Sequence, residues 1–498
     1  MDQVDLLYQQ FLEVVKKHVP DALFDLLDQA YKFAKEAHKD QRRQSGESYI
    51  IHPIHVATNL AELNMDSHAI AAGLLHDVLE DTETTPEILE QEFGQNIRDL
   101  VEGVSNLSKL KFNQNTLYIE NLRKMFISTA TDIRVIIIRL CDRLHNMQTL
   151  EYLTTEQQQR IAQETLEIYA PIAHRLQIGQ LRGELEDWAF KFLYPEEYRW
   201  LYNITHKKFI EREQNLMMVK KNIVNILHSE GIETVAVEHR KKHLYSLFQK
   251  MLRYDNDLSQ IHDIIAIRVI VPKISDCYAA LGMIHREYTP LKGRIKDYIA
   301  RPKANGYTSL HTTVILSGGE TIEIQIRTSE MHDKARFGIA AHWQYKESGA
   351  YPHRQKQVSW VKELAKIIQD IDDLSDLDTV KLDLFKHRIF VLTPKADVID
   401  LPADSTPVDF AYHIHTDIGN QITQSKINGV IKPLSTNLQN GDIVEIITDK
   451  KKKGPDIKWL EFVRTSQARS KIKHYNRKKL ARWEADLSSK ELKKKRSK

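Results

Sequence analysis

The stretch Gly293–Thr313, GRIKDYIARPKANGYTSLHTT, combines positive charge, aromatic rings and a tight turn within a short length. Its cationic and aromatic residues are Arg294, Lys296, Arg301, Lys303, His311, Tyr298 and Tyr307, beside an Asn305-Gly306 turn. Lysine and arginine neutralise phosphate oxygens, and an aromatic ring offers a stacking face to a planar base. The stretch therefore indicates a site for a phosphate-bearing ligand with a flat base. The alternative is a charged surface loop before a strand, and the flanking sequence decides between the two.

The bulk composition is that of a soluble globular protein. A length of 498 residues suggests about three or four domains, and 42% hydrophobic and 28% charged residues are ordinary values. No apolar run approaches the roughly 20 residues of a membrane span, and the N-terminus lacks the pattern of a signal peptide. The two cysteines, Cys141 and Cys277, exclude a disulfide framework and a CxxC zinc site. We expect a protein of the reducing cytoplasm without a membrane partner.

Charge is distributed unevenly along the chain. The net charge is +3, but residues 450–498 carry 19 lysines and arginines against 5 acidic residues. A basic tail on an acidic body indicates a polyanionic partner, most simply RNA. A solvated helical tail that only aids solubility is the equally weighted alternative.

Residues 1–195 have helical periodicity throughout and contain four candidate metal ligands, His52, His76, Asp77 and Asp142. His76-Asp77 lies on one predicted helix, and Asp142 begins a polar stripe that follows the buried run Val135–Ile138. A buried polar stripe needs partners, and a metal ion is one. Two imidazoles with two carboxylates suit manganese or iron better than structural zinc. Satisfied core or surface residues remain the alternative, since the chain has 22 histidines.

Residues 196–229 are expected to form connecting helices, and residues 230–350 change to mixed α/β periodicity. The buried strand 261–271 opens near Asp263, and Thr321–Thr328 alternates, with Ile322, Ile324 and Ile326 on one side and Glu323, Gln325 and Arg327 on the other. The outer side could be solvated, or it could form the floor of a nucleotide site. No GxxxxGK[ST] motif is present, which excludes a P-loop. A nucleotidyltransferase-like site remains, with carboxylates on strands that hold magnesium.

The C-terminal part has a linker helix at 351–385, a strand-rich module at 386–449 and a basic helical tail at 450–498. Thr406-Pro407 followed by Asp409 is a helix-start signature. Strands wrapped on one helix suggest a β-grasp module.

Together these segments resemble the RelA/SpoT homologue family of (p)ppGpp synthetases and hydrolases. The motifs that carry the resemblance are RRQSGESYIIHP, LLHDVLEDT, ENLRKM, CDRLHNMQTL, ETLEIYAPIAHRL, KHLYSL, the opening stretch, EIQIRT, GIAAHWQYKE and TPKADVIDLPADSTPVDFAYHIHTDIG. The resemblance implies an all-α HD phosphohydrolase domain at 1–195, an α/β nucleotidyltransferase-like synthetase domain at 230–350 and a β-grasp TGS domain at 386–449. The RIKD form of the opening stretch resembles the bifunctional members.

For the hydrolase, the resemblance assigns one manganese ion to His52, His76, Asp77 and Asp142. Glu80 and Asp81 match an acidic pair that manages protons, while nucleotide contacts fall on Arg43, Ser45, Asn146 and Thr149. The implied reaction removes pyrophosphate from the ribose 3′ oxygen of (p)ppGpp. Gln44 stands where the family often has lysine.

For the synthetase, the resemblance implies pyrophosphate transfer from ATP to the 3′ hydroxyl of GDP or GTP, with release of AMP. Asp263 and Glu323 match the magnesium carboxylates, and Glu323 is also a candidate to accept the 3′ proton. The ATP phosphate contacts match Arg240, Lys242 and Lys250. The acceptor side matches Arg294, Lys296, Lys303, Asn305, Tyr307, His311 and Gln325, with Tyr307 placed to stack on guanine.

Three departures from the family pattern concern the synthetase. His239–His243 replaces a common GRPKH, Gln249 replaces a basic residue, and Arg336 occupies a usual glutamate position. The first two bear on ATP affinity, so a hydrolase with a weakened synthetase is one alternative function.

A TGS-based RNA-binding regulator is another alternative. His413 matches a position where the family meets the 3′ end of tRNA, which makes deacylated tRNA or the ribosome expected partners. The chain resembles a short form without the C-terminal zinc-finger and ACT modules, an absence expected to weaken ribosome-coupled control.

Overall fold

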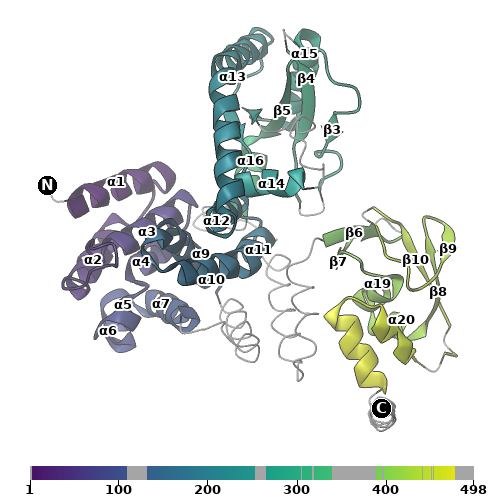
Figure 1. Cartoon of the computed structure of the whole chain (residues 1–498), viewed down its shortest axis with the longest axis horizontal. Coiled ribbons are helices and arrows are strands. Elements are labelled where there is room, and N and C mark those ends of the chain that lie inside the picture. Colours follow the sequence, from purple (N-terminus) through teal and green to yellow (C-terminus); the bar gives the residue numbers. More distant parts are fainter. Residues whose placement is uncertain are drawn as a thin grey trace. The chain divides into compact units, whose positions relative to one another are not determined.

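The structure, a computed structural model, describes residues 3–108, 132–252, 265–303, 306–316, 319–338, 388–394, 398–439, 441–449, 451–452 and 454–476. The chain divides into two compact units, the first of which holds elements α1 to α16 and the second the elements from β6 onwards (Figure 1). Within these ranges no helix combines the length and the apolar character that crossing a membrane requires.

The N-terminal part of the first unit is built from helices, as the periodicity predicts. These are α1 (Gln3–His18), α2 (Phe24–Ala37), α3 (Ile51–Glu62), α4 (Ser67–Leu75), α5 (Val78–Asp81), α6 (Pro86–Phe93), α7 (Gln95–Ser108), α9 (Ile133–Gln148), α10 (Thr155–Glu164), α11 (Ala170–Arg175) and α12 (Gly179–Leu193), with a short 3₁₀ helix η1 (Leu150–Tyr152) and a short π-helix η2 (Thr165–Tyr169). Helix α3 packs against α1, α4 and α9. The helices that carry the candidate metal ligands therefore form the centre of this domain.

A five-stranded sheet forms the rest of the first unit. Its elements are α13 (Pro195–Ser229), β1 (Ala236–Lys241), α14 (Leu244–Met251), β2 (Ile265–Val271), α15 (Ile274–Glu287), β3 (Lys296–Asp297), β4 (Leu310–Ile315), β5 (Thr321–Thr328) and α16 (Ser329–Phe337). The strand order is β1-β2-β5-β4-β3, with β2 parallel to β5 and the other pairs antiparallel. Helices α13 and α15 cover one face and share its hydrophobic core.

The alternation predicted for Thr321–Thr328 is confirmed. Ile322, Ile324 and Ile326 point into the core that the sheet shares with α13 and α15. Since neighbours on a strand point to opposite faces, Glu323, Gln325 and Arg327 lie on the other face, away from those helices. This polar face is where the candidate nucleotide residues gather.

Residues 196–229 differ from the expected set of connecting helices, because Pro195–Ser229 forms one continuous helix of 35 residues. No proline or glycine follows Pro195 within the segment. Proline suits the first position of a helix, and both residue types would interrupt its interior.

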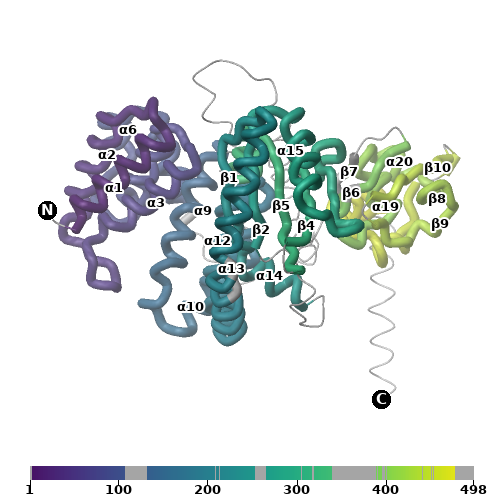
Figure 2. The backbone as a smooth tube through the Cα atoms, turned by 90° about the horizontal axis from the view of Figure 1, so that it is seen from above, coloured from purple at the N-terminus to yellow at the C-terminus, as the bar shows by residue number. Residues whose placement is uncertain are grey.

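Helix α12 is shared between the helical domain and the sheet domain (Figures 1 and 2). It packs against α9 and α10 on one side and against α14 and α16 on the other. Phe190 stacks on Phe248 of α14, with ring centroids 4.8 Å apart, and is fully buried there with Leu201, Leu247 and Met251. The two domains of the first unit are thus joined through a hydrophobic contact.

The second unit contains the strand-rich module predicted at 386–449, and its core also includes Trp459, Val463, Ala468 and Ile472, from the segment that the sequence analysis assigned to the basic tail. It contains β6 (Arg388–Leu392), β7 (Val398–Pro402), α19 (Pro407–Ile414), α20 (Thr416–Gln421), β8 (Ile422–Ile427), β9 (Val430–Lys432), β10 (Val444–Thr448), η7 (Ile457–Glu461) and a helix at 466–476. The predicted helix start is confirmed, because Thr406 and Asp409 form a reciprocal capping box. The linker expected at 351–385 lies outside the described residues.

Asp409 holds the second unit together with both carboxylate oxygens. One oxygen accepts from the backbone N–H and hydroxyl of Thr406, each at 2.8 Å. The other accepts from the N–H of Arg464 at 2.9 Å and from the N–H and hydroxyl of Thr465 at 2.8 and 2.9 Å. The fully buried side chain therefore ties the start of α19 to a segment 55 residues later.

Asp409→Ala is expected to destabilise this unit by at least about 3 kcal/mol, because it leaves several buried donors without an acceptor. Scanning calorimetry of the full chain would measure the effect as a lower unfolding temperature. The control is Asp417→Asn, which changes an exposed carboxylate of α20. Equal unfolding temperatures for the two variants would contradict this role of Asp409.

Candidate functional site

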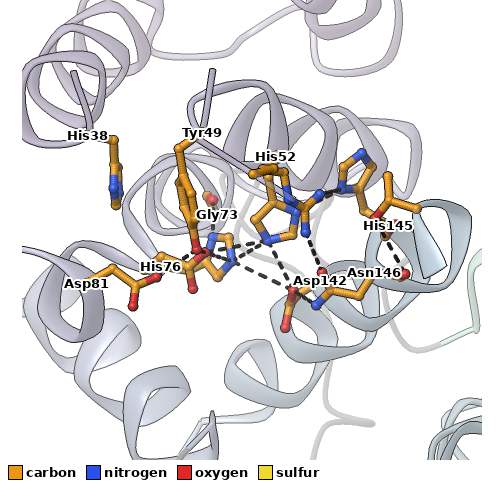
Figure 3. Close-up of polar contacts among 12 residues, drawn as sticks. His38, Tyr49, His52, Gly73, His76, Asp81, Asp142, His145 and Asn146 are labelled. Carbon is orange, nitrogen blue, oxygen red and sulfur yellow. Dashed lines mark hydrogen bonds and ion pairs between the residues drawn. The ribbon is translucent and has the colours of Figure 1, made fainter. Parts of the chain in front are cut away.

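Two helices and a helix–helix junction bring the four predicted metal ligands together in the helical domain. His52 lies in the first turn of α3, and Asp142 lies in α9. His76 and Asp77 occupy the junction between α4 and α5, where the chain leaves one helix and enters the next. Figure 3 shows the side chains of His52, His76 and Asp142 converging on one point.

The donor atoms are close enough to share one ion. The Nε2 atom of His52 lies 3.2 Å from that of His76, 3.5 Å from Asp77 Oδ2 and 3.2 Å from Asp142 Oδ1. The Nε2 atom of His76 lies 3.1 Å from Asp77 Oδ2 and 3.8 Å from Asp142 Oδ1. Bonds of about 2.0–2.2 Å to one ion place neighbouring ligand atoms about 3 Å apart. The donor set and its spacing therefore fit a divalent metal.

Outer hydrogen bonds turn both imidazoles toward this point. The Nδ1 atom of His76 lies 2.8 Å from the Gly73 carbonyl oxygen, which can only accept, so Nδ1 carries the proton and donates. Arg43 can only donate, at 3.1 Å, to Nδ1 of His145. That nitrogen is therefore an acceptor, and Nδ1 of His52, 2.7 Å away, donates to it. Both bonds direct the Nε2 atoms at the candidate metal position. Burial alone would lower the pKa of His76, but Asp77 raises it to about 9, so a metal bound there would displace the Nε2 proton.

Burial and neighbouring charge set the protonation of these groups. Burial lowers the pKa of His52, and burial together with His52 lowers the pKa of His145 to about 2, so His145 is neutral. Burial alone would raise the pKa of Asp142, but the Arg139 guanidinium holds it well below its ordinary value. Arg139 forms an ion pair with Asp142 one helical turn away. The centre thus keeps an ionised carboxylate in a buried position.

Tyr49 connects two of the acidic residues. Its hydroxyl lies 2.9 Å from Asp77 Oδ2 and 2.6 Å from Oδ2 of Asp81, which Figure 3 shows beside it. Burial and these carboxylates hold the pKa of Tyr49 above its ordinary value, so the phenol keeps its proton and donates. Sequence analysis missed Tyr49 and Arg139. For Arg139 the available signal was its spacing, three residues before Asp142, whereas Tyr49 contacts Asp77 across 28 residues and the sequence offers no such signal.

Some of the other predicted hydrolase residues bond to the candidate metal ligands, and others make only local hydrogen bonds nearby. Asn146 donates to Asp142 Oδ1 at 2.6 Å and accepts from Arg43 at 2.8 Å, so both join the ligand network directly. Glu80 lies in α5 and contributes to the field at Arg139. The hydroxyls of Ser45 and Thr149 bond locally, to Glu47 at 3.2 Å and to the His145 carbonyl at 3.2 Å.

The polar face of the sheet brings together a second set of predicted residues. Lys296 on β3 pairs with His311 on β4, which pairs with Gln325 on β5. His311 Nδ1 lies 3.2 Å from Glu323 Oε1, and Gln325 donates to the same oxygen at 2.6 Å. Because Glu323 accepts from Nδ1, the Nε2 atom of His311 accepts from the Tyr307 hydroxyl at 2.9 Å.

Cations gather around this chain of hydrogen bonds. The Lys303 ammonium lies 4.6 Å from the ring centroid of Tyr298 and 5.1 Å from that of Tyr307. Burial lowers the pKa of His311 despite its Glu323 partner, and the charges of Lys303 and Arg240 act in the same direction as burial. The lysine and arginine side chains around this neutral imidazole give the polar face a positive charge, which suits it to bind phosphates.

The segment His239–His243, which differs from the family pattern, begins within a regular β-strand. Strand β1 continues to Lys241, and Arg240 pairs with Ala266 of β2. Arg240 alternates with the buried Val237 and therefore lies on the polar face. Lys242 follows the strand directly and Lys250 lies in α14, while Arg294 is exposed just before β3. Asp263 and Asn305 lie outside the described residues.

Two further arginines lie on this face but were not among the predicted site residues. Arg268 of β2 pairs in register with Gln325, and its guanidinium lies 3.6 Å from Glu238. Arg327 is buried, 3.2 Å from His332 Nδ1. Burial and the charge of Arg268 lower the pKa of Arg327 to about 10. Their positions follow from strand alternation, which is the signal that could have identified them.

Comparison with protein families finds three matches along the chain. Residues 30–179 match the HD domain, residues 239–350 the region found in RelA / SpoT proteins, and residues 389–448 the TGS domain. The three-domain fold class expected from the sequence is thereby confirmed.

Curated proteins similar to the chain come from several bacteria. It is 46% identical over 472 residues to the guanosine-3′,5′-bis(diphosphate) 3′-pyrophosphohydrolase of Aquifex aeolicus, covering 94% of this chain and 67% of that protein. It is 45% identical over 489 residues to the GTP pyrophosphokinase of Myxococcus xanthus, covering 96% and 64%. It is 43% identical over 471 residues to the bifunctional (p)ppGpp synthase/hydrolase SpoT of Escherichia coli, covering 94% and 67%. The chain thus spans about two thirds of the length of these relatives.

Tyr49→Phe is expected to weaken Mn²⁺ binding to the purified protein about tenfold, because it removes an outer-shell donor that orients Asp77. Titration calorimetry with Mn²⁺ would measure the affinity. Tyr152→Phe, which changes an exposed ring in η1, is the matched control. An unchanged affinity in Tyr49→Phe would show that the phenol does not support the ligand set.

Proposed function

The chain belongs to the RelA/SpoT family, and on that premise we propose that it both makes and degrades (p)ppGpp in the cytoplasm. In one reaction it transfers pyrophosphate from ATP to the 3′ hydroxyl of GDP or GTP, which yields (p)ppGpp and AMP. In the other it hydrolyses (p)ppGpp to GDP or GTP and pyrophosphate. The observation that carries the proposal is the convergence of His52, His76 and Asp142 on one buried point, with Asp77 Oδ2 within 3.5 Å of both imidazoles. This centre occurs in the same unit as a cationic sheet face that carries Glu323.

In the hydrolase, His52, His76, Asp77 and Asp142 would hold the metal, for which we propose manganese. A bound manganese ion would supply Lewis-acid chemistry at the 3′ phosphate and lower the pKa of water. Arg139 and Tyr49 keep the carboxylates oriented through the contacts described above. Glu80 and Asp81 are placed in the adjacent helix α5, where they would accept and return protons.

The nucleotide in the hydrolase would lie against the residues around Arg43. Its guanidinium is part of the ligand network through Asn146 and His145, so a phosphate bound there would be neutralised beside the metal. Ser45 lies in the same turn as Arg43, and Thr149 ends the helix that carries Asp142 and Asn146. These two hydroxyls are suited to hydrogen-bond the ribose or base.

In the synthetase, Arg240, Lys242 and Lys250 would neutralise the ATP phosphates, and Arg294, Lys296, Lys303, Asn305 and Gln325 the acceptor side. The 3′ oxygen of the acceptor attacks the β-phosphorus of ATP, the bond from that phosphorus to the α–β bridging oxygen breaks, and AMP leaves. Glu323, held by His311 and Gln325, would take the 3′ proton and, with Asp263, would hold magnesium. Tyr307, fixed at its hydroxyl by His311, would present a ring face to guanine.

Deacylated tRNA and the ribosome are the macromolecular partners that we propose for the second unit. His413 is exposed on α19, as a residue that meets an RNA end must be. A gel-shift assay with deacylated tRNA tests the first partner, and no shift at micromolar protein would remove it.

Paired assays of the two reactions test the proposed function. Wild-type protein with Mg²⁺, ATP and GDP should form AMP and ppGpp, and ppGpp with Mn²⁺ should give GDP and pyrophosphate. Asp77→Ala should reduce hydrolysis more than about 100-fold, since it removes a ligand and not merely an outer-shell partner. Glu323→Gln should reduce synthesis about 100-fold or more by removing the proton acceptor.

Each variant should retain the reaction of the other domain, and so serves as the control for folding. Normal hydrolysis without synthesis in the wild type would favour a hydrolase with a weakened synthetase. Absence of both reactions would overturn the proposal.

A further inference from the structure

Asp187 belongs to α12, near the end of the hydrolase part of the chain, yet its carboxylate contacts the synthetase domain. One oxygen accepts from the backbone N–H of Tyr245 at 2.9 Å. The other lies 2.9 Å from Nδ1 of His243, which must donate because a carboxylate only accepts. None of the three residues in these contacts, Asp187, His243 and Tyr245, has been assigned a role in synthesis or hydrolysis above.

The Tyr245 contact is a helix cap supplied from another domain. His243 occupies the N-cap position of α14, but its own side chain makes no capping hydrogen bond. Tyr245 is the second residue of that helix, and the N–H at this position is one that a capping side chain normally binds. Asp187 therefore does for α14 what a serine or aspartate at position 243 would do, and its negative charge is also favourable at a helix N-terminus.

The surrounding packing fits this arrangement. Gly183 lies one turn before Asp187 on α12, and a Cβ atom there would lie 2.2 Å from the imidazole of His243. Any larger residue at position 183 would displace the ring from Asp187. The glycine thus leaves room for the histidine that the carboxylate holds.

The far end of α14 is fixed by a hydrophobic core, whereas its first turn borders a cavity. Leu247 and Met251 are buried against Phe190. A cavity of about 280 Å³ is lined by residues that include Asp187, Lys242 and His243. Leu244 and Tyr245 of the first turn are only partly buried against the same core, so the two hydrogen bonds that Asp187 accepts add a polar restraint on His243 and Tyr245 at this end.

We propose that Asp187 is a positioning residue of the synthetase, which holds the start of α14 so that Lys242 and its neighbours are preorganised for the phosphates of ATP. The inference rests on the proposed function, because the donor side is assigned to Arg240, Lys242 and Lys250 there. It adds a residue from outside the synthetase domain, acting through His243 and a backbone N–H and not on the substrate itself.

The test compares Asp187→Ala and Asp187→Asn with the wild type in steady-state synthesis. Asp187→Ala should raise KM for ATP about fivefold or more, because the stability that the cap gives to the first turn of α14 must then come from ATP binding. KM for GDP, kcat at saturating ATP and the hydrolysis rate should stay close to the wild-type values. Asp187→Asn keeps an oxygen for the Tyr245 N–H but loses the carboxylate toward His243, so it should give a smaller rise.

Glu167→Gln is the matched control, since it neutralises an exposed carboxylate of the same domain whose partner is Gln163. It should leave every constant unchanged. A fall in kcat for both reactions without a change in KM for ATP would indicate a merely structural role and overturn the proposal. If Asp187→Ala does not fold, as judged by loss of hydrolysis, Asp187→Asn is used instead. A higher KM for ATP in that variant supports the proposal, and an unchanged KM for ATP overturns it.

Hydrogen exchange of the peptide 244–251 gives a readout that does not depend on activity. Its amides should exchange faster in Asp187→Ala than in the wild type and Glu167→Gln. If the wild type makes no ppGpp, the proposed function fails while faster exchange still supports the cap. Unchanged exchange would overturn the cap even in an active enzyme.

Discussion

The helical domain depends on one electrostatic constraint: Asp142 and the imidazoles of His52 and His76 are buried at a single point. Removing an ionised carboxylate from water costs several kcal/mol unless partners compensate for it. Here each group has at least one such partner: Arg139 and Asn146 for Asp142, His145 for His52, and the Gly73 carbonyl for His76. A divalent cation is the further partner that this donor set fits, and α3, α4 and α9 pack against one another around its position.

The sheet domain also has charged groups wholly or partly removed from water, but there the charge is positive. Its polar face gathers lysines and arginines, among them the partly buried Arg268 and the buried Arg327. Two carboxylates lie among them in the described residues: Glu238 beside Arg268, and Glu323, which is held by His311 and Gln325. Such a surface favours polyphosphate ligands, because their negative charge relieves the repulsion among the cations. Helix α12 touches both domains, through α9 on one side and α14 on the other, so a displacement of this helix would reach both sites.

Much of this organisation follows from local sequence pattern. The change of hydrophobic period near residue 230, the alternation in Thr321–Thr328 and the capping box at Thr406 all describe short-range physics, and the structure agrees with each. Residues that are far apart in the sequence could be assigned to one site where each lies in a recognisable motif, as His52 and Asp142 do. The roles of Tyr49 and Asp187 were not, since they arise from contacts across 28 and 58 residues that leave no periodic trace. The continuous helix α13 was also missed, because charge-rich sequence does not reveal where one helix ends and another begins.

The central claim is that the four convergent donors hold one metal ion, and pulsed electron paramagnetic resonance of the full chain loaded with Mn²⁺ tests it most directly. We predict one tightly bound Mn²⁺ per chain whose spectrum shows hyperfine coupling to two imidazole nitrogens, with that coupling reduced to one nitrogen in His52→Ala. A tightly bound ion without nitrogen coupling, or a spectrum that His52→Ala leaves unchanged, would contradict the account.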